Sequence, residues 1–486
     1  MPAATAQQDT LLRDLGRICG ESNVVTGRQT DGYARDWRGQ YPSRPLAVVR
    51  PGTTEDVSAI LRLANDRKCP VVPIGGNTGL VGGTQTDDGL MVSLERMKDI
   101  RSVDPAGRTA CVDAGITVEE LNRQVAAYGL RFPLAFGAQG SAMIGGALST
   151  NAGGANVLAF GMARSLCLGL EVVLPDGRIL NDMVALRKNN TGYDLKQLFI
   201  GAEGTLGLIT GAVVTLTDLP MTYATALISV GSIRDGLTAL DRLRRACGSQ
   251  LEAFEIMPAS YLRRLKASRG TPTVPFSEIP SAAILVEIAS SSTADCTSDE
   301  QGATPLTERL IAALGDCIGA NILADAVVAH NANQRAELWR LRDIASEMTK
   351  GLAPVVAADV SVPLNLIEKF EPSLEDHVRA IDPDALIWTV GHLGDGNLHV
   401  VVCTDDKTPE HMARIRSVID DMTLRFQGSF SAEHGIGTQK LASMAAFKSP
   451  VALDLMEGIK AVFDPNRIMN PGKVLPDRLP GKTYEK

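Results

Sequence analysis

Two histidines near each other in the sequence are of a type and spacing that could hold a metal ion. His392 and His399 flank residues 394–397 (GDGN), whose two glycines and aspartate are typical of a tight loop. That spacing can bring both imidazoles back to one point, which Glu433, beside His434, could also approach. Two imidazoles and a carboxylate suit Zn²⁺ or Mn²⁺ and leave positions open for a substrate. The spacing alone slightly favours the alternative that these are three hydrogen-bonded polar residues in turns.

Three glycine-rich stretches could hold a phosphate group. They are residues 75–83 (GGNTGLVGG), 145–154 (GGALSTNAGG) and 201–207 (GAEGTLG). Loops of this kind place several backbone N–H groups in one concavity, without Cβ atoms to block a phosphate. The first stretch lacks both the GxGxxG spacing of a Rossmann turn and the Lys-Ser/Thr of a Walker A loop, which disfavours NAD and ATP. Any one stretch could be only a turn, but three of them favour a phosphate site.

The elements around the first two stretches follow an α/β pattern between residues 45 and 216. We expect a strand at 46–49, then a helix that begins at Thr53 with a capping box, and a strand at 70–74 that leads into the first glycine stretch. A second capping box predicts a helix over 118–128, with Gly129 as its C-cap.

The pattern changes near residue 220, where strand-like runs begin to alternate with long helices, as in a separate α+β domain. The expected strands are 224–230, 282–289, 385–390 and 398–402, and the expected helices include 234–247 and 304–314. Surface loops are expected at 268–279 and 290–304, and a mainly helical segment at the C-terminal end. The sequence therefore predicts three parts: residues 1–220, 221–425 and 426–486.

Composition limits the partners and the compartment. The 486 residues include 48 basic and 56 acidic side chains, a net charge of −8, and no Lys/Arg-rich block, which argues against nucleic acid and anionic membranes as partners. No apolar run approaches the roughly 18 residues that span a bilayer. The eight cysteines form no CxxC pair and residues 1–12 do not read as a secretory signal, so we expect reduced cysteines and a cytoplasmic protein, with loose membrane association left open.

Six motifs occur in an order that resembles a known family. They are residues 73–83, 144–154, 187–209, 391–399 (GHLGDGNLH), 432–437 (AEHGIG) and 464–473 (DPNRIMNPGK). Together they resemble the FAD-linked dehydrogenases of the vanillyl-alcohol oxidase superfamily, in particular the D-2-hydroxyglutarate and D-lactate dehydrogenase branch, over residues 20–475. The resemblance implies an α+β fold with a vanillyl-alcohol oxidase-type FAD-binding domain, an antiparallel-sheet substrate (cap) domain and a helical C-terminal segment that returns to the flavin.

The resemblance also implies which residues hold FAD. The 75–79 loop would hold the pyrophosphate, while the other two stretches and the C-terminal motif would line the rest of the cofactor. The implied residues are Pro73, Gly75, Gly76, Asn77, Thr78, Gly79, Leu80, Gly145, Gly146, Ser149, Thr150, Asn151, Gly153, Gly154, Glu203, Gly204, Gly207, Ile209 and Asn470. Some members attach the flavin to an N-terminal histidine, but no histidine precedes His330 here, so non-covalent FAD is expected.

In the metal-dependent branch, the positions of His392, His399 and Glu433 are ligands of Zn²⁺ or Mn²⁺, and His434 is the general base. Arg342 and Ser346, four residues apart on a predicted helix, would bind the substrate together with Asn397 and His434.

Two departures from that branch concern substrate choice. Ala357 stands where the branch has a substrate-contacting lysine, and Val401 where it has an asparagine. A dicarboxylate would lose two polar contacts, so D-lactate or a longer apolar D-2-hydroxy acid becomes competitive with D-2-hydroxyglutarate.

The resulting hypothesis is an FAD- and metal-dependent oxidation of a D-2-hydroxy acid, with hydride transferred to flavin N5. The electron acceptor would be an electron-transfer flavoprotein, a quinone or a cytochrome, and a homodimer is compatible with it. One alternative is a non-catalytic or glycolate-oxidase-like flavoprotein subunit of an electron-transfer complex. Another is a metallohydrolase, which would leave the glycine stretches without a purpose.

Overall fold

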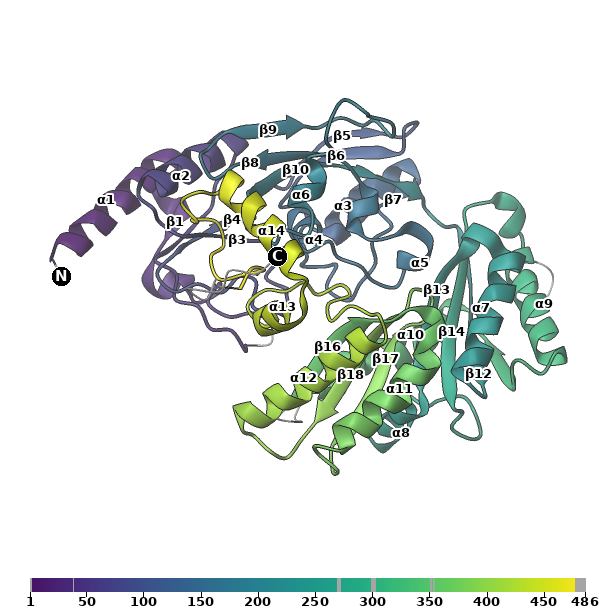
Figure 1. Ribbon diagram of the computed structural model, residues 1–486. Helices are drawn as coiled ribbons and strands as arrows, with labels where there is room; N and C mark the ends of the chain where they lie inside the picture. The colour runs from purple at the N-terminus through teal and green to yellow at the C-terminus, as the bar shows by residue number, and fades with distance from the viewer. Residues whose placement is uncertain are drawn as a thin grey trace. The chain divides into compact units, whose positions relative to one another are not determined.

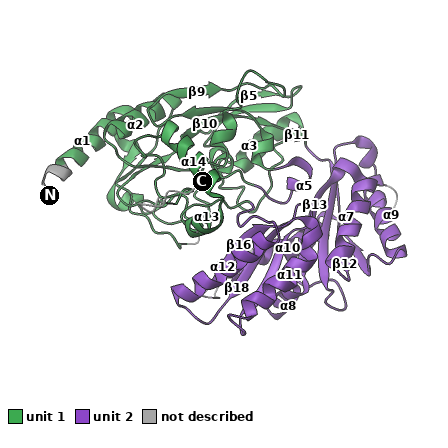
Figure 2. Cartoon of the chain, viewed as in Figure 1, with its two compact units in different colours: residues 1–152, 162–218, 433–486 green, residues 153–161, 219–432 purple. Residues whose placement is uncertain are grey.

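The computed structural model describes residues 2–37, 39–268, 272–298, 303–349, 352 and 355–476, without the side chains of residues 2–5 and 346. Contacts divide the chain into two compact units (Figure 2). Unit 1 comprises residues 1–152, 162–218 and 433–486, and unit 2 comprises residues 153–161 and 219–432. Each unit is built from segments that are distant in the chain. Motifs that are far apart in the sequence can therefore belong to the same unit.

The first sheet of unit 1 is a four-stranded α/β layer in the order β1-β2-β4-β3. Its strands are β1 (Val24–Val25), β2 (Ala47–Val49), β3 (Val71–Ile74) and β4 (Leu90–Ser93), and β4 lies parallel to β2 and β3. Helix α1 (Pro2–Cys19) precedes this sheet, and α2 (Thr54–Asp66) connects β2 to β3. The Thr53 side chain accepts from the Asp56 amide at 3.0 Å, so the predicted N-cap of α2 is present. The Asp56 carboxylate accepts from the Gly52 amide at 2.9 Å, one residue before the position that a capping box requires.

The second sheet of unit 1 is antiparallel and has the order β5-β6-β10-β8-β9. These strands are β5 (Ile100–Asp104), β6 (Thr109–Asp113), β8 (Cys167–Val173), β9 (Ile179–Asp182) and β10 (Leu208–Thr215), while β7 (Leu130–Arg131) pairs with β11 (Thr217–Asp218). Helices α3 (Val118–Val125), α4 (Ile144–Ser149) and α6 (Lys196–Phe199) belong to the same unit. The predicted helix over 118–128 is α3 followed by a 3₁₀ turn, and Gly129 ends it in the left-handed conformation, as expected.

The C-terminal segment belongs to unit 1. It contains α13 (Leu441–Phe447) and α14 (Pro450–Phe463), with irregular backbone before and after them. Beyond α14, Met469 pairs with Val71 at the open edge of β3, where the Val71 amide donates to Ile468 and the Asn470 amide donates to Val71, both at 2.7 Å. The segment therefore extends a sheet that begins near the other end of the chain.

Unit 2 is built on a seven-stranded antiparallel sheet in the order β15-β12-β14-β13-β17-β18-β16 (Figure 1). The strands are β12 (Thr222–Val230), β13 (Leu251–Pro258), β14 (Ala282–Ser290), β15 (Asp325–Val328), β16 (Val355–Ser361), β17 (Leu386–His392) and β18 (Asn397–Cys403). Helices α7 (Ile233–Cys247), α9 (Pro305–Gly319), α11 (Leu364–Arg379) and α12 (Pro409–Arg425) pack on one face, and α8 (Ala259–Ala267) and α10 (Ala332–Asp343) on the other. The short α5 (Val157–Phe160) also belongs to unit 2.

The two faces of this sheet follow from the alternation of side chains along each strand. In β18, Leu398, Val400 and Val402 pack under α7, α9, α11 and α12, whereas Val401 and Cys403 pack toward α8 and α10. We call the second side the α8/α10 face. By the same alternation His399 of β18 and His392 of β17, two of the predicted metal ligands, belong to that face.

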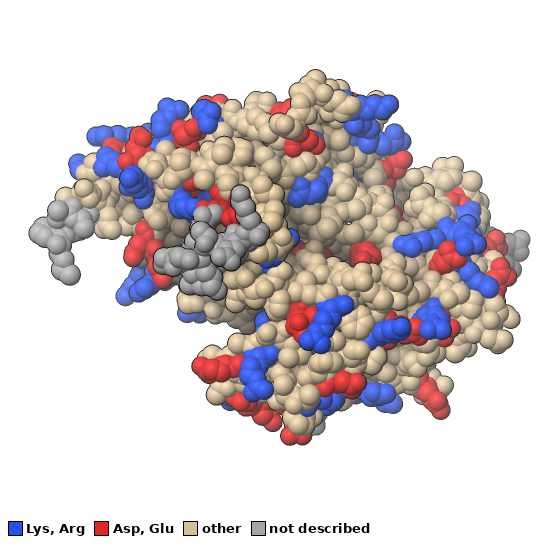
Figure 3. Space-filling model, viewed as in Figure 1, with Lys and Arg blue, Asp and Glu red and all other residues tan. Residues whose placement is uncertain are grey.

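Among the described residues, no helix combines the length and apolar character needed to cross a membrane. On the side of the molecule drawn in Figure 3, basic and acidic side chains are interspersed rather than gathered in one patch. On this side a negatively charged ligand would therefore be held by groups close to it rather than by a charged surface.

Candidate functional site

The β17–β18 hairpin brings the two histidines of the GHLGDGNLH motif together. Val390 is paired with His399, and His392 with Asn397, across the two strands. The Gly396 amide donates to the His392 carbonyl at 3.0 Å and closes the turn. Gly396 has φ +85°, and a Cβ there would clash with the carbonyl oxygen of Val362, which explains the glycine. The two imidazole rings meet edge to face, with 5.5 Å between centroids.

A buried aspartate that the sequence analysis missed completes this edge of the sheet. Asp359 of β16 is fully buried and is paired with His399 of β18. Its Oδ1 lies 3.8 Å from Nδ1 of His399. Asn397 donates to Oδ1 at 2.9 Å, and the Ala432 amide donates to Oδ2 at 3.1 Å. The predicted role of Asn397 in substrate binding stays a prediction, because its amide is used here to orient Asp359.

The Ala432 bond leads directly to the Glu433-His434 pair. One ligand atom from each of Asp359, His399, Glu433 and His434 can be chosen so that all four lie within 4.8 Å of one another. We call these four residues the ligand cluster. Carboxylate oxygens and imidazole nitrogens at such separations fit a divalent metal ion of the zinc or manganese type.

His392 lies beside this cluster and is held by a second buried carboxylate. Its Nδ1 is 2.6 Å from Oε1 of Glu255, and it is 7% exposed. A metal-binding histidine commonly donates one ring N–H to a carboxylate and presents the other nitrogen to the metal. The setting of His392 thus fits its predicted role as a ligand, which stays a prediction.

Arg342 is paired with the same carboxylate. Its Nε donates to Oε2 of Glu255 at 2.9 Å, and the two side chains are 12% and 1% exposed. Burial alone would raise the pKa of Glu255, but the charges of His392 and Arg342 outweigh it and hold this pKa below its usual value. Arg342 is therefore a largely enclosed, paired residue rather than a solvated helix arginine. The described structure does not include the side chain of Ser346.

Glu255 could have been noticed in the sequence. It lies between Phe254 and Ile256 in a mainly apolar strand whose other charged residue is Glu252, and a buried charge at such a position requires a partner. Its partners Arg342 and His392 lie 87 and 137 residues away along the chain, so only the structure reveals which residues Glu255 pairs with.

The two departures from the family pattern are neighbours in space. Ala357 in β16 is paired with Val401 in β18, and Val401 is paired with Trp388 in β17. This row lies two residues from the row Val390–His399–Asp359 on each of the three strands. Both missing polar contacts therefore fall in one place on the α8/α10 face.

In unit 1 the first two glycine stretches are held tightly against each other. A Cβ on Gly76 would clash with the carbonyl oxygen of Ser141, which precedes the second stretch, whereas one on Gly79 would meet nothing within 4 Å. Asn77 has φ +52°, and its side chain donates to the Arg35 carbonyl at 2.7 Å. The loop after β3 is therefore shaped by close backbone contacts.

Glu203 joins the remaining pieces of the predicted cofactor site. Its carboxylate accepts from the amides of Ile436 and Gly437 at 2.6 and 2.8 Å, and its own amide donates to Ser149 at 2.8 Å. Burial raises the pKa of Glu203, and the two N–H donors act against that rise. Glu203 thus fixes the backbone just after His434, while its predicted contact with the cofactor stays a prediction.

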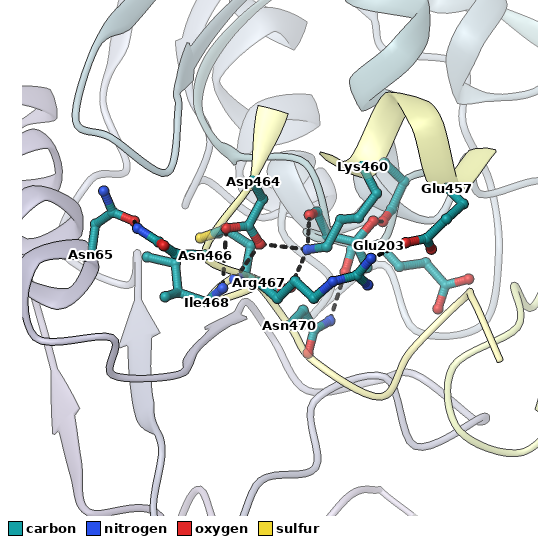
Figure 4. Close-up of polar contacts among 12 residues, drawn as sticks. Asn65, Glu203, Glu457, Lys460, Asp464, Asn466, Arg467, Ile468 and Asn470 are labelled. Carbon is teal, nitrogen blue, oxygen red and sulfur yellow. Dashed lines mark hydrogen bonds and ion pairs between the residues drawn. The ribbon is translucent and has the colours of Figure 1, made fainter. Parts of the chain in front are cut away.

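The C-terminal motif is fixed by a buried ion pair (Figure 4). Lys460 donates to Asp464 at 2.5 Å and to the carbonyls of Thr205 and Met469, and Asp464 accepts from the amides of Ile468 and Met469. This arrangement holds Asn470, whose Nδ2 donates to the carbonyls of Gly83 and Glu203 at 2.9 and 2.7 Å.

The Oδ1 atom of Asn470 is buried and has no partner among the described residues. It lies between the first and third glycine stretches, where a hydroxyl or ring N–H of a bound FAD would satisfy it. An acceptor of this kind among tightly packed glycine loops fits the flavin dinucleotide that the motifs suggest.

Two family models match the chain. Residues 45–182 match "FAD binding domain", and residues 219–474 match "FAD linked oxidases, C-terminal domain". A zebrafish (Danio rerio) protein named "D-2-hydroxyglutarate dehydrogenase, mitochondrial" is 36% identical over 445 residues, 91% of this chain and 81% of that protein. A Xanthomonas citri pv. viticola protein named "D-2-hydroxyglutarate dehydrogenase" is 36% identical over 448 residues, 91% of this chain and 92% of that protein.

Solved structures share the fold. A p-cresol methylhydroxylase superposes with a TM-score of 0.73 at 17% identity, covering 96% of this chain and 97% of that one. The 4-ethylphenol oxidase from Gulosibacter chungangensis gives a TM-score of 0.68 at 16% identity, covering 97% and 98%. The predicted fold class is confirmed.

The expected cytoplasmic location is corrected by the comparisons. The zebrafish relative and those from rice (Oryza sativa) and cattle (Bos taurus) are named as mitochondrial proteins. The eight cysteines are all free, but free cysteines argue only against an oxidising compartment. They could not distinguish the cytosol from another reducing compartment.

Proposed function

Because the chain belongs to the family of FAD-linked oxidases and is an FAD-dependent dehydrogenase, we propose that it oxidises a D-2-hydroxy acid to the 2-oxo acid. D-2-Hydroxyglutarate is the first candidate, since relatives that match most of the chain carry its name. One observation carries the proposal: the ligand cluster lies beside His392 and the buried Glu255–Arg342 pair.

FAD would be held by the three glycine stretches and by Asn470, without a covalent bond. Bound FAD supplies the redox chemistry by accepting the hydride from C2 of the substrate. The chain contributes the backbone N–H groups of its loops and the acceptor Oδ1 of Asn470.

A divalent metal would be held by His392, His399 and Glu433. His399 and Glu433 belong to the ligand cluster, and the ring centroid of His392 is 5.5 Å from that of His399. Asp359, also in the cluster, is within reach of the same metal. Zinc or manganese bound there would lower the pKa of the substrate hydroxyl. Glu255 fixes the ring of His392, and Asn397 fixes the carboxylate of Asp359. Both side chains would therefore be oriented before a metal ion binds.

His434 would remove the hydroxyl proton, because it adjoins Glu433 in the ligand cluster and a neutral imidazole accepts a proton near neutral pH. Arg342 would bind the C1 carboxylate with the part of its guanidinium that is not donating to Glu255. The reduced flavin would pass electrons to an electron-transfer flavoprotein, a quinone or a cytochrome.

A purified protein tests this proposal. We expect a yellow protein with about one FAD that acid releases, and reduction of an artificial acceptor by D-2-hydroxyglutarate, D-malate, D-lactate or D-2-hydroxybutyrate. A chelator should abolish turnover while FAD stays bound. A flavoprotein that no D-2-hydroxy acid reduces would contradict the proposal and support the electron-carrying subunit, and a colourless protein with hydrolytic activity would support the metallohydrolase.

A further inference from the structure

Three polar atoms on the α8/α10 face have no hydrogen-bond partner among the residues that the structure describes. They are Nε1 of Trp388, Nε of Arg264 and Oγ of Ser260, and all three are buried. Trp388 as a whole is only 2% exposed. Buried N–H groups are normally paired, so a group of unpaired ones indicates that an acceptor binds there.

The three side chains come from two neighbouring elements. Ser260 and Arg264 are four residues apart on α8 and therefore share one side of that helix. The Arg264 guanidinium carbon lies 6.0 Å from the centre of the Trp388 ring, and Trp388 belongs to β17 beneath α8. Two N–H donors, one of them charged, and a hydroxyl thus surround one region.

This region lies next to the ligand cluster, two residues further along the strands of the sheet. Trp388 is paired with Val401 and Val401 with Ala357, whereas His399 and Asp359 form the next row. Rows two residues apart along a strand are roughly 6.5–7 Å apart. The terminal carbons of an extended five-carbon acid are roughly 5 Å apart, and a C–O bond of about 1.2 Å and a hydrogen bond of about 2.9 Å extend the reach of its second carboxylate beyond that spacing. Such an acid held at the ligand cluster therefore reaches the Trp388 row.

We propose that Arg264, Trp388 and Ser260 form a binding site for the second carboxylate of a dicarboxylic D-2-hydroxy acid. The proposal rests on the proposed function and specifies its substrate class. These side chains would supply the polar contacts that Ala357 and Val401 cannot. An apolar substrate tail would leave both N–H groups unpaired, whereas a carboxylate satisfies both and neutralises the guanidinium charge.

The test compares two acids of equal length in the holoenzyme. D-2-Hydroxyglutarate carries the second carboxylate, and D-2-hydroxyvalerate has a methyl group in its place. We expect the unmodified enzyme to prefer the dicarboxylate at least tenfold in kcat/KM. Arg264→Met should lower kcat/KM for D-2-hydroxyglutarate about 10- to 100-fold, as expected for one charged hydrogen bond, mainly through KM. D-2-Hydroxyvalerate should change less than about twofold.

Two further variants separate binding from support of the fold. Trp388→Phe keeps the ring and removes only the N–H, so the selectivity should fall by a smaller factor, about 3- to 10-fold. Arg263→Met removes the same charge from the adjacent, exposed position of α8 and should leave both substrates unaffected.

Equal or better turnover of D-2-hydroxyvalerate by the unmodified enzyme would overturn the proposal, as would an equal loss for both acids in Arg264→Met. Calorimetric titration of the holoenzyme with 2-oxoglutarate and 2-oxovalerate decides the matter independently of turnover. A preference for 2-oxoglutarate that Arg264→Met removes supports the site, and equal binding overturns it. Absence of turnover with every D-2-hydroxy acid would contradict the proposed function alone.

Discussion

The cofactor loops of unit 1 and the α8/α10 face of unit 2 are built in different ways. Unit 1 shapes its loops with backbone: Gly76 allows close approach, and the Glu203 carboxylate holds two amides. Unit 2 uses side chains from β13, β16, β17 and β18 that only the register of the sheet brings together. A site shaped by backbone leaves long continuous motifs in the sequence. A site made of side chains from several strands leaves isolated residues, apart from the one motif of the β17–β18 hairpin. Substitutions should therefore act differently in the two units.

The largest effect is expected for a predicted metal ligand. His399→Ala removes an imidazole from the ligand cluster, so turnover should fall roughly 1,000-fold or more, because a bound metal contributes several kcal/mol to catalysis. Metal content should fall with it, while FAD should remain, because its proposed binding loops lie in unit 1. Elemental analysis and the flavin spectrum measure both. The matched control is His377→Ala, on the exposed side of α11. An active His399→Ala enzyme with full metal content would refute the assignment.

Arg342→Ala should give the next largest effect. We expect kcat/KM to fall about 30- to 1,000-fold, since a charged hydrogen bond to a buried carboxylate contributes roughly 2–4 kcal/mol. The variant also leaves Glu255 buried without its cation, which should lower the free energy of unfolding by about 3–5 kcal/mol.

The double variant Arg342→Met/Glu255→Gln removes the charge imbalance and should recover most of the stability without the activity. Arg340→Ala, exposed on the same helix, is the control. Recovery of activity in the double variant would show that Arg342 only neutralises Glu255 and does not bind substrate.

If close backbone contacts shape the loop after β3 in unit 1, two glycines of that loop should respond differently to substitution. Gly76→Ala must displace the Ser141 carbonyl, and overpacking of this kind costs about 1–3 kcal/mol, so FAD affinity should fall about 5- to 150-fold. Gly79→Ala places its methyl group in open space and should bind FAD normally. Titration of the apoproteins with FAD measures the difference. Equal affinities would mean that the loop adapts and is not shaped by this contact.

The smallest effect is expected for a buried side-chain network away from the loops. Glu171 accepts from Arg101, Thr54 and Thr210 at 2.7–2.9 Å. Burial opposes its ionisation, but these donors outweigh it and lower its pKa below the ordinary 4.5. The stability from its charge is therefore present above pH 4.5 and is lost as the pH falls through the lowered pKa.

Glu171→Gln should accordingly lower the unfolding free energy by about 1–2 kcal/mol at pH 7, and the deficit should shrink as the pH falls below about 4.5. Thermal unfolding at several pH values measures it, with exposed Glu337→Gln as the control. FAD affinity should stay unchanged. A deficit that is constant with pH would mean that the Glu171 charge is not responsible.

The sequence predicted local elements well because their signals are local. The Thr53 cap of α2, the left-handed Gly129 and the four predicted strands β12, β14, β17 and β18 all depend on residues close in the chain. The sequence did not predict β13, β15 and β16 of the same sheet. The antiparallel sheet was expected from the resemblance, but its strand order was not, because pairing between β13 and β17 depends on distant segments. The cytoplasmic location was wrong, since neither cysteine usage nor net charge is specific to one compartment.

For the candidate site, the hairpin explains why two histidines seven residues apart could be paired from their spacing. Asp359 and Glu255 were missed because each is an isolated acidic residue in a mainly apolar strand, and its partner lies on another strand. Arg264 and Trp388 carry no motif at all. Their proximity arises where α8 packs over β17, which no spacing in the sequence reveals.

The position of the C-terminal motif also has a consequence for the order of synthesis. Residues 468–470 lie against β3, which the ribosome completes almost 400 residues earlier, and Lys460 and Asp464 hold them there. Nascent chains that lack this segment have an open edge at β3 and lack Asn470. We therefore expect flavin to be acquired only after nearly the whole chain has emerged, so that chains stopped before residue 460 emerge without cofactor and with an unpaired strand edge that favours aggregation.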